Sequence, residues 1–236
     1  MRGLSSISHF ALVIMCMAGC NPSDEDCVTD ATYNPTIDPA DFVAEINNPL
    51  LPFMPGTRFV YRGGDETIEV TVTSDTRLIL GVTTRVVRDV ATVNGEVVED
   101  TFDWYAQDVA GNVWYFGEDT REYEGGVVVG TEGSWEAGVD GAKAGIVMHA
   151  IQPAAGLPYR QEYYACEAED MAEVVSLDNA VTVPFGSFSG CLKTREFTPL
   201  EPEANEHKFY GPGVGLLLEI DIATGDRMEL VSIDTP

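Results

Sequence analysis

The chain has 236 residues, of which 44% are hydrophobic and 9% aromatic, enough to bury a sizeable core. Its 39 acidic side chains outnumber the 13 basic ones, which gives a formal net charge of −26 at pH 7. A field of this sign repels nucleic acid and anionic lipid head groups, so the composition argues against any nucleic-acid partner. The acidic residues are spread along the chain, which is typical of a solvated acidic surface and leaves a dedicated cation site as the alternative.

Residues 1–19 have the pattern of a secretion signal peptide. One basic residue, Arg2, precedes an apolar run over residues 10–18. That run is about half of the ~20 residues that cross a bilayer as a stable helix, so we expect a cleaved signal and not a membrane anchor. The run ends at Met17-Ala18-Gly19-Cys20, which resembles the lipobox of bacterial lipoproteins.

The lipobox resemblance implies that Cys20 is acylated and becomes the first residue of the mature protein, which makes a membrane its partner through the lipid. The alternative is an unmodified cysteine that happens to follow a signal. Cleavage removes Arg2 and leaves 12 basic and 39 acidic side chains, a formal charge of −27. Asn21 follows Cys20 where Asp would favour the inner membrane, so we expect a lipid-anchored protein of the bacterial cell envelope, at the outer membrane or cell surface.

The mature chain divides into a tether and one domain. Residues 20–39 are acidic and rich in turn residues, which predicts a flexible tether, and residues 40–236 form the β-rich globular domain. Asp38 followed by Pro39 indicates a helix start. We expect a short helix with Phe42, Val43 and Ile46 on its apolar face, ended by residues 47–49.

Beyond residue 55 the dominant hydrophobic period is two. Residues 67–73 alternate cleanly and place Ile68, Val70 and Val72 on one face of a strand. Asn94-Gly95 is the strongest hairpin signal, because both turn positions need positive φ. Residues 103–108 and 113–117 flank a turn and predict an aromatic hairpin, and another turn is expected at Gly125-Gly126. Residues 134–156 lack a period and are expected to be a long connection.

Further strands are expected in the second half of the chain, at residues 159–164, 171–177, 181–185, 191–197, 208–210, 215–222 and 227–233. Many short strands joined by hairpins indicate an all-β, mainly antiparallel fold. We therefore predict a curved sheet, either a half-barrel or a sandwich, with one short N-terminal helix.

Three segments resemble a large group of uncharacterised bacterial secreted and lipoprotein domains. Residues 53–61 are similar to its opening PGTRWVY strand, residues 181–193 to its VTVPAGTFxxCLK segment, and residues 206–216 to EHKYYAPGVGL. Phe185 and Gly211 stand where that group has alanine. The resemblance spans most of residues 50–233 and implies a curved antiparallel sheet similar to periplasmic lipoprotein carriers. It brings no activity and no catalytic residues.

Three cysteines remain once Cys16 leaves with the signal and Cys20 is acylated. In an oxidising compartment two of them can pair. We expect a disulfide between Cys166 and Cys191, which both lie in the folded part, with Cys27 free in the tether. The other pairings stay open.

The sequence offers little for catalysis. Only His149 and His207 remain after the signal is removed, and residues 186–190 do not form a nucleophile elbow. Metalloprotease, phosphate-loop and dinucleotide motifs are absent from the sequence, so no cofactor is expected. Neighbouring carboxylates are abundant, and two of them at the right separation can hydrolyse glycosides, which keeps a surface hydrolase acting through Glu203 or Glu206 as an alternative.

Two places in the sequence suggest a divalent cation such as Ca²⁺. Glu203, Glu206 and His207 offer oxygen and imidazole ligands, with Asp170 as a further candidate; the alternative is an exposed polar pair at a strand start. Residues 108–112 resemble half of a calcium turn but lack the terminal glutamate.

The aromatic hairpin is the candidate ligand-binding region. Trp104, Trp114 and Phe116 are expected either to line a pocket for an apolar ligand or to fill the core. Our leading hypothesis is a lipid-anchored, non-enzymatic binding or envelope domain whose partner is an apolar small molecule or a protein. The alternatives are the carboxylate-based hydrolase and a calcium-stabilised structural lipoprotein.

Overall fold

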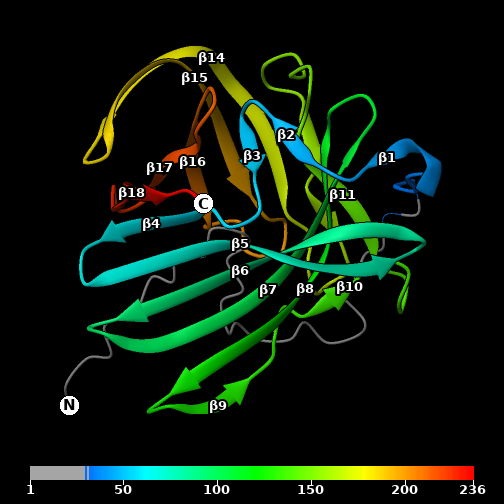
Figure 1. The fold of residues 1–236 in the computed structure, drawn as a ribbon, viewed down its shortest axis with the longest axis horizontal. Coiled ribbons are helices and arrows are strands. Elements are labelled where there is room, and N and C mark those ends of the chain that lie inside the picture. The colour runs from blue at the N-terminus through cyan, green and yellow to red at the C-terminus, as the bar shows by residue number, and fades with distance from the viewer. Residues whose placement is uncertain (1–29, 31) are drawn as a thin grey trace.

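The computed structural model describes residue 30 and residues 32–236 (Figure 1). The predicted signal peptide, the lipidation site Cys20 and most of the predicted tether therefore lie outside the described residues. In the part of the chain that is described, no helix is long and apolar enough to span a membrane.

One large antiparallel sheet dominates the fold and curves until it nearly closes (Figure 1). In spatial order its main path runs through β12 (Pro158–Arg160), β14 (Met171–Val183), β15 (Gly186–Phe197), β16 (Asn205–Gly211), β17 (Gly215–Asp221), β18 (Arg227–Asp234), β4 (Arg58–Gly63), β5 (Glu66–Ile79), β6 (Val82–Val93), β7 (Glu96–Asp108), β8 (Val113–Glu124), β11 (Lys143–Met148) and β13 (Glu162–Tyr163). Three short strands pair beside this path: β1 (Phe42–Val43) with β7, and β9 (Val127–Gly130) and β10 (Trp135–Glu136) with β8.

Residues 158–163 join the two edges of the sheet. β12 pairs with β14 at one edge, and β13, which follows after a single residue, pairs with β11 at the other. This closure needs a glycine on β11, because a Cβ at Gly145 would overlap the backbone of Gln161. The sheet therefore encloses an interior on its concave side.

β18 completes the other half of the sheet. It pairs with β17 on one side and with β4 on the other, so that one of the last strands of the chain lies beside one of the first. An ion pair of 3.1 Å between Arg58 and Asp234 fastens this junction, and Arg58 also pairs with Glu69 on β5.

A separate hairpin of β2 (Ile46–Asn48) and β3 (Leu51–Phe53) lies across the concave side of the sheet (Figure 1). We call residues 46–53 the cover hairpin. The side chain of Gln107 accepts hydrogen bonds from the backbone N–H groups of Asn47 and Asn48, at 2.9 and 2.8 Å. On the opposite side the N–H of Gly213 donates to the carbonyl of Pro49 at 2.6 Å. The hairpin is thus held by both walls without belonging to the main sheet.

The structure confirms the predicted fold class. Ile68, Val70 and Val72 are buried on one face of β5, as the alternation predicts. Asn94 and Gly95 have φ of 53° and 84° and form the turn between β6 and β7. The region expected to be a long connection contains β10 and β11.

The predicted short N-terminal helix is wrong beyond its first turn. Only a 3-10 turn, η1 (Pro39–Asp41), forms, and the side chain of Asp38 caps it by accepting a 3.0 Å hydrogen bond from the N–H of Ala40. Phe42 then pairs with Asp108 on β7. A helix this short is only marginally stable, whereas pairing with an existing sheet satisfies the backbone at once.

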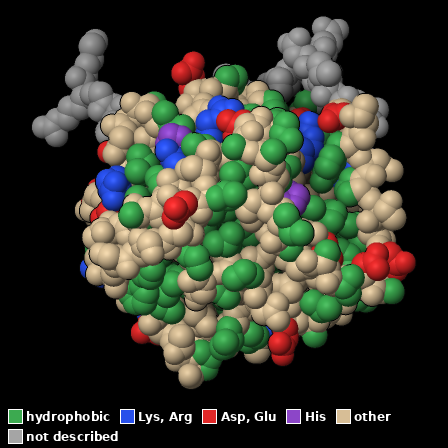
Figure 2. All heavy atoms as spheres, turned by 90° about the horizontal axis from the view of Figure 1, so that it is seen from above, with side chains coloured by type: hydrophobic (Ala, Val, Ile, Leu, Met, Phe, Trp, Pro, Cys, Tyr) green, Lys and Arg blue, Asp and Glu red, His purple; other side chains and the backbone are tan. Residues whose placement is uncertain are grey.

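The view from above shows hydrophobic side chains in small groups over this face, with only a few acidic side chains between them (Figure 2). Scattered hydrophobic groups of this kind are ordinary on protein surfaces. The feature that distinguishes the fold is therefore the interior.

Candidate ligand-binding site

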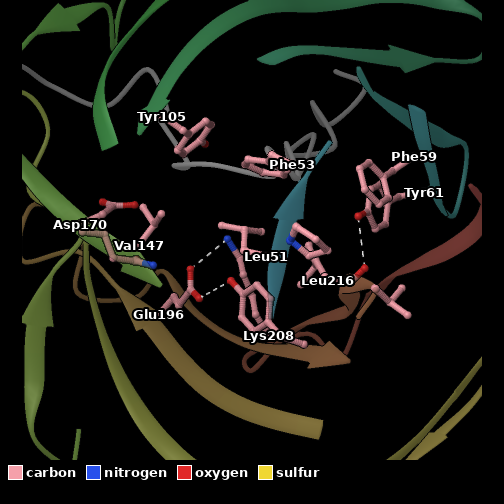
Figure 3. A pocket seen from close by; sticks show the side chains of 15 residues that line it. Leu51, Phe53, Phe59, Tyr61, Tyr105, Val147, Asp170, Glu196, Lys208 and Leu216 are labelled. Atoms are coloured by element: carbon pink, nitrogen blue, oxygen red, sulfur yellow. Dashed lines mark hydrogen bonds and ion pairs between the residues drawn. The ribbon is translucent and has the colours of Figure 1, made fainter. Parts of the chain in front are cut away.

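A pocket lies in the interior, between the cover hairpin and the concave face of the sheet (Figure 3). Its cavity volume is about 50 Å³, which at roughly 10–15 Å³ each is room for three to five waters. Most of its wall is apolar or aromatic. The lining residues are Leu51, Pro52, Phe53, Phe59, Tyr61, Tyr105, Val147, Gln161, Asp170, Glu196, Lys208, Tyr210, Val214, Gly215 and Leu216.

Strand alternation places the apolar wall. Phe59 and Tyr61 are two residues apart on β4 and therefore point to the same, concave side. The hydroxyl of Tyr61 donates to the carbonyl of Leu216 on β17 at 3.2 Å, and burial raises the pKa of this phenol. From β7, Tyr105 packs on Phe53 of the cover hairpin, with ring centroids 5.1 Å apart.

The polar end of the pocket is built around the ammonium group of Lys208. Its Nζ lies 3.1 Å from Glu196 on β15, 3.5 Å from Glu219 on β17 and 3.7 Å from Glu206, which is two residues away on the same strand, β16. Burial acts to lower the pKa of Lys208, but the three carboxylates outweigh it and raise this pKa well above its usual value. Lys208 is therefore charged and held by carboxylates on several sides.

Asp170 adds a fourth carboxyl group to this end. Burial raises its pKa to about 7; Lys208 opposes this shift, while Glu196 and Glu206 add to it. The hydroxyl of Tyr210 donates to Glu196 at 2.9 Å, so the carboxylate of Glu196 is also tied to the pocket wall. Carboxyl groups outnumber the single lysine, and the polar end carries no net positive charge.

A second group of buried acids lies further along the interior and does not line the pocket. The hydroxyl of Tyr115 is 2.8 Å from Asp103 and 2.9 Å from Glu118. Since one hydroxyl carries one proton, it donates to one carboxyl and accepts from the other, which must be protonated. In agreement, burial raises the pKa of Asp103 to about 7 and that of Glu118 well above its ordinary value. Nearby Glu162 is fully buried, and burial raises its pKa as well.

The predicted cation site does not assemble. Glu206 and His207 are neighbours on β16 and so point to opposite faces: Glu206 turns inward to Lys208, and His207 lies beside Arg195. Burial and the positive charges of Lys193 and Arg195 lower the pKa of His207. Glu203 is exposed in the preceding loop. Among the described residues no group of three or more His, Cys, Asp or Glu is placed to hold a metal ion.

The half calcium turn at residues 108–112 is explained by its own hydrogen bonds. The carboxylate of Asp108 accepts from the backbone and side-chain N–H groups of Asn112, at 2.9 and 2.8 Å, and from the indole N–H of Trp114, at 2.8 Å. These oxygens therefore shape the turn between β7 and β8.

The three aromatic residues predicted to line a ligand pocket do not line the one that is present. Trp104 lies under the guanidinium group of Arg77, 4.0 Å from it. Trp114 and Phe116 both pack edge-on against Phe42, with centroids 6.2 and 5.5 Å away. These three side chains pack on the side of β7 and β8 that faces away from the pocket, which agrees with the core-packing alternative.

The inward face of the aromatic hairpin belongs to the alternate residues Tyr105 and Tyr115. Their rings stack 4.9 Å apart, and Tyr105 lines the pocket. The predicted hairpin therefore forms, and the side of it that faces the pocket carries Tyr105 and not Trp104.

The predicted disulfide between Cys166 and Cys191 is also wrong. Cys191 is a free, buried thiol on β15, in register with Asn179. Cys166 lies in a tight turn with φ of 65°, where its N–H donates to Glu169 at 3.0 Å. Cys166 is disulfide-bonded, but not to Cys191.

Of the residues at the polar end, Asp170 was predicted only as a candidate metal ligand and Glu206 as a candidate metal ligand or hydrolase carboxylate, and Lys208, Tyr210, Glu196 and Gln161 were not predicted as site residues. Glu206, Lys208 and Tyr210 recur at a spacing of two within one strand, which places them on one face. Lys208 is moreover one of only three lysines in the chain. Glu196 and Gln161 carry no such signal, because Glu196 lies on the neighbouring strand β15 and Gln161 is the single residue between β12 and β13.

Comparison with known proteins adds little. No family model matches the chain, and no curated protein matches it. Among solved structures there is a likeness to a "putative lipoprotein" from Parabacteroides distasonis ATCC 8503, with 12% sequence identity over 79% of this chain and 99% of that one. The TM-score is 0.36, and a likeness of this size carries no argument about the present chain.

Proposed function

We propose that the chain is an exported lipoprotein, anchored to the bacterial cell envelope through Cys20, whose domain binds an apolar small molecule in the interior pocket. The lipobox-like residues 17–20 support the anchor. The observation that carries the binding function is the pocket itself, which has an apolar wall, one polar end and a cover that is not part of the sheet.

The cover hairpin accounts for the small size of the cavity. Sites for small molecules usually measure roughly 300–1,000 Å³, whereas about 50 Å³ is open in this pocket. Leu51 and Phe53 project from the cover into the remaining space (Figure 3). A ligand larger than a few waters enters by displacing these two side chains.

Displacing the cover hairpin has a high free-energy cost without a ligand and almost none with an apolar ligand in the pocket. Exposing a buried Leu or Phe side chain costs about 1.5–3 kcal/mol, so lifting both from the pocket costs roughly 3–6 kcal/mol. An apolar ligand that takes their place covers the same wall and offsets this cost. The closed cover therefore protects an apolar interior from water until a ligand fills it.

Photo-crosslinking in membranes tests this function on the full chain. The probe is an eight-carbon alcohol that carries a photoreactive diazirine, and the labelled peptides are identified by mass spectrometry. We expect labelling in residues 51–61 and 208–216, which meet at the pocket. Labelling confined to exposed segments such as β9 would refute the proposal.

A pair of phenylalanine variants sharpens the test. Phe53→Ala removes a ring that lines the pocket and should raise pocket labelling several-fold. Phe116→Ala removes the same ring from a fully buried position away from the pocket, and should cost stability without raising the labelling. Equal labelling in the two variants would mean that the probe does not occupy the space beside Phe53.

A further inference from the structure

The polar end of the pocket contains groups that a ligand can reach. Gln161, Asp170, Glu196, Lys208 and Tyr210 all line the same cavity as the apolar wall. Glu196 faces Lys208 across this end, and Asp170 lies beside Val147 at its margin (Figure 3). An elongated ligand with its apolar part against the wall therefore presents its other end to these side chains.

The charge at this end discriminates between head groups. Among the described residues, Lys208 is the one basic residue that lines the pocket, and Glu196, Glu206 and Glu219 already surround it. The ammonium group of Lys208 is therefore already paired with glutamate side chains. An anionic head group finds carboxyl groups at this end and no free positive charge. Burial raises the pKa values of Glu206 and Glu219, whereas Asp170, with a pKa of about 7, is ionised at pH 8. Because Coulomb repulsion inside a protein is stronger than in water, the carboxylate of Asp170 opposes an anion at this end.

Gln161 places an uncharged amide at the same end. Only 6% of the residue is exposed, it lines the cavity, and its backbone N–H donates to the carbonyl of Asp170 at 2.8 Å. The side-chain oxygen of an amide accepts hydrogen bonds. A hydrogen-bond donor bound in the cavity therefore finds an acceptor on Gln161 as well as on Asp170.

We infer that the pocket takes an amphiphile whose polar end is a hydrogen-bond donor without negative charge, namely an alcohol or an amine, and that it rejects carboxylates and phosphates. The inference rests on the proposed function and names the class of its ligand. The head group donates to the side-chain oxygen of Gln161 and to the carboxyl of Asp170. A fatty acid or an anionic phospholipid matches the apolar wall but not this end.

Three matched probes test the inference on the unmodified full chain. They share one eight-carbon diazirine chain and end in a hydroxyl, an amine or a carboxylate. The protein is held in phosphatidylcholine vesicles at pH 8, above the pKa of about 7 that burial gives Asp170. For each probe, pocket labelling is divided by labelling of the exposed β9, which corrects for partition into the vesicle.

We expect the alcohol and the amine to exceed the carboxylate at least ten-fold in this ratio. A carboxylate ratio equal to or above the others would overturn the inference and leave the proposed function intact. Failure of all three probes to label the pocket would overturn both.

A charge variant separates the polar end from the rest of the pocket. Asp170→Asn keeps the shape of the side chain and removes one negative charge, so it should lower the amine ratio and raise the carboxylate ratio several-fold. Asp178→Asn, at an exposed position on β14, the strand that begins directly after Asp170, should change neither. Identical ratios in the two variants would count against the assigned role of Asp170, and the wild-type comparison stands even if Asp170→Asn folds poorly.

Discussion

Replacing Asp103 by asparagine should make the protein more stable at pH 8 and leave its stability nearly unchanged at pH 4.5. Asp103 is 2% exposed, and burial raises its pKa from 3.8 to about 7. Asparagine has the shape of the protonated acid, and its amide can donate to Tyr115 in place of the acid proton. The variant therefore resembles the wild type at low pH and avoids burying a charge at high pH.

The magnitude follows from proton linkage. Between pH 4 and pH 7 the folded state keeps a proton that the unfolded state has lost, so stability falls as pH rises through this window. Each pH unit costs about 1.4 kcal/mol, which sums to about 4 kcal/mol by pH 8 for this one group. In a chain of this size 1 kcal/mol corresponds to about 2–4 °C in Tm, so the variant should melt about 10 °C above the wild type at pH 8.

Thermal unfolding followed by circular dichroism at pH 4.5, 6 and 8 measures this difference. Asp178→Asn serves as the control, because its carboxylate is exposed and its replacement should shift Tm little at any pH. If Asp103→Asn lowers Tm equally at all three pH values, the carboxyl of Asp103 is ionised and paired in the folded state, and the reasoning about Tyr115 fails.

Three further predictions concern the closure, the cover and the free thiol. Gly145→Ala should lower Tm by 5 °C or more, on the order of 2 kcal/mol, because the sheet must open beside Gln161; Gly186→Ala, where a Cβ has ordinary contacts, should lower it far less, and equal losses would contradict the closure. Gln107→Leu removes the hydrogen bonds that hold β2, so hydrogen–deuterium exchange in residues 46–53 should rise at least ten-fold while β5 stays protected; unchanged exchange would show that Gln107 does not fasten the cover. Cys191 should react with a thiol reagent only after unfolding, and rapid reaction in the native protein would contradict its burial.

Local patterns predicted much of the fold. The alternation at Ile68, Val70 and Val72 reflects a strand with one buried face, and Asn94-Gly95 is a turn because both residues tolerate positive φ. Such features depend on a few consecutive residues, and a single sequence contains that information. The order of the strands along the sheet also follows from the sequence, because most neighbouring strands are consecutive in the chain and are joined as hairpins.

The aromatic hairpin shows where this information ends. Trp104 is 4% exposed and Tyr105 is 1% exposed, so both faces of β7 are buried at this point. Alternation of polar and apolar residues identifies the interior only when one face meets water. Which face points inward depends instead on long-range contacts. Phe53 packs against Tyr105 on one side of the hairpin, and Phe42 packs against Phe116 on the other.

The polar end and the closure depend on similar long-range contacts. Glu196 and Lys208 lie on adjacent strands, but Gln161 and Asp170 reach the same cavity from the segments that join the sheet edges. The hydrophobic pattern of residues 158–163 does not indicate that this short segment pairs with β14 at one sheet edge and with β11 at the other. The cysteine pairing failed for the same reason, because the geometry of Cys191 is set by its neighbours in the sheet.

The position of β18 has a consequence for the timing of folding. Arg58 and Asp234 meet across 176 residues of chain, and β18 fills the middle of the sheet. A chain still emerging from a ribosome or a translocation channel leaves β4 and β17 without their shared neighbour, so the ring of strands cannot form stepwise as synthesis proceeds. Pairings of such high contact order are slow, which favours delivery of the whole domain before it assembles.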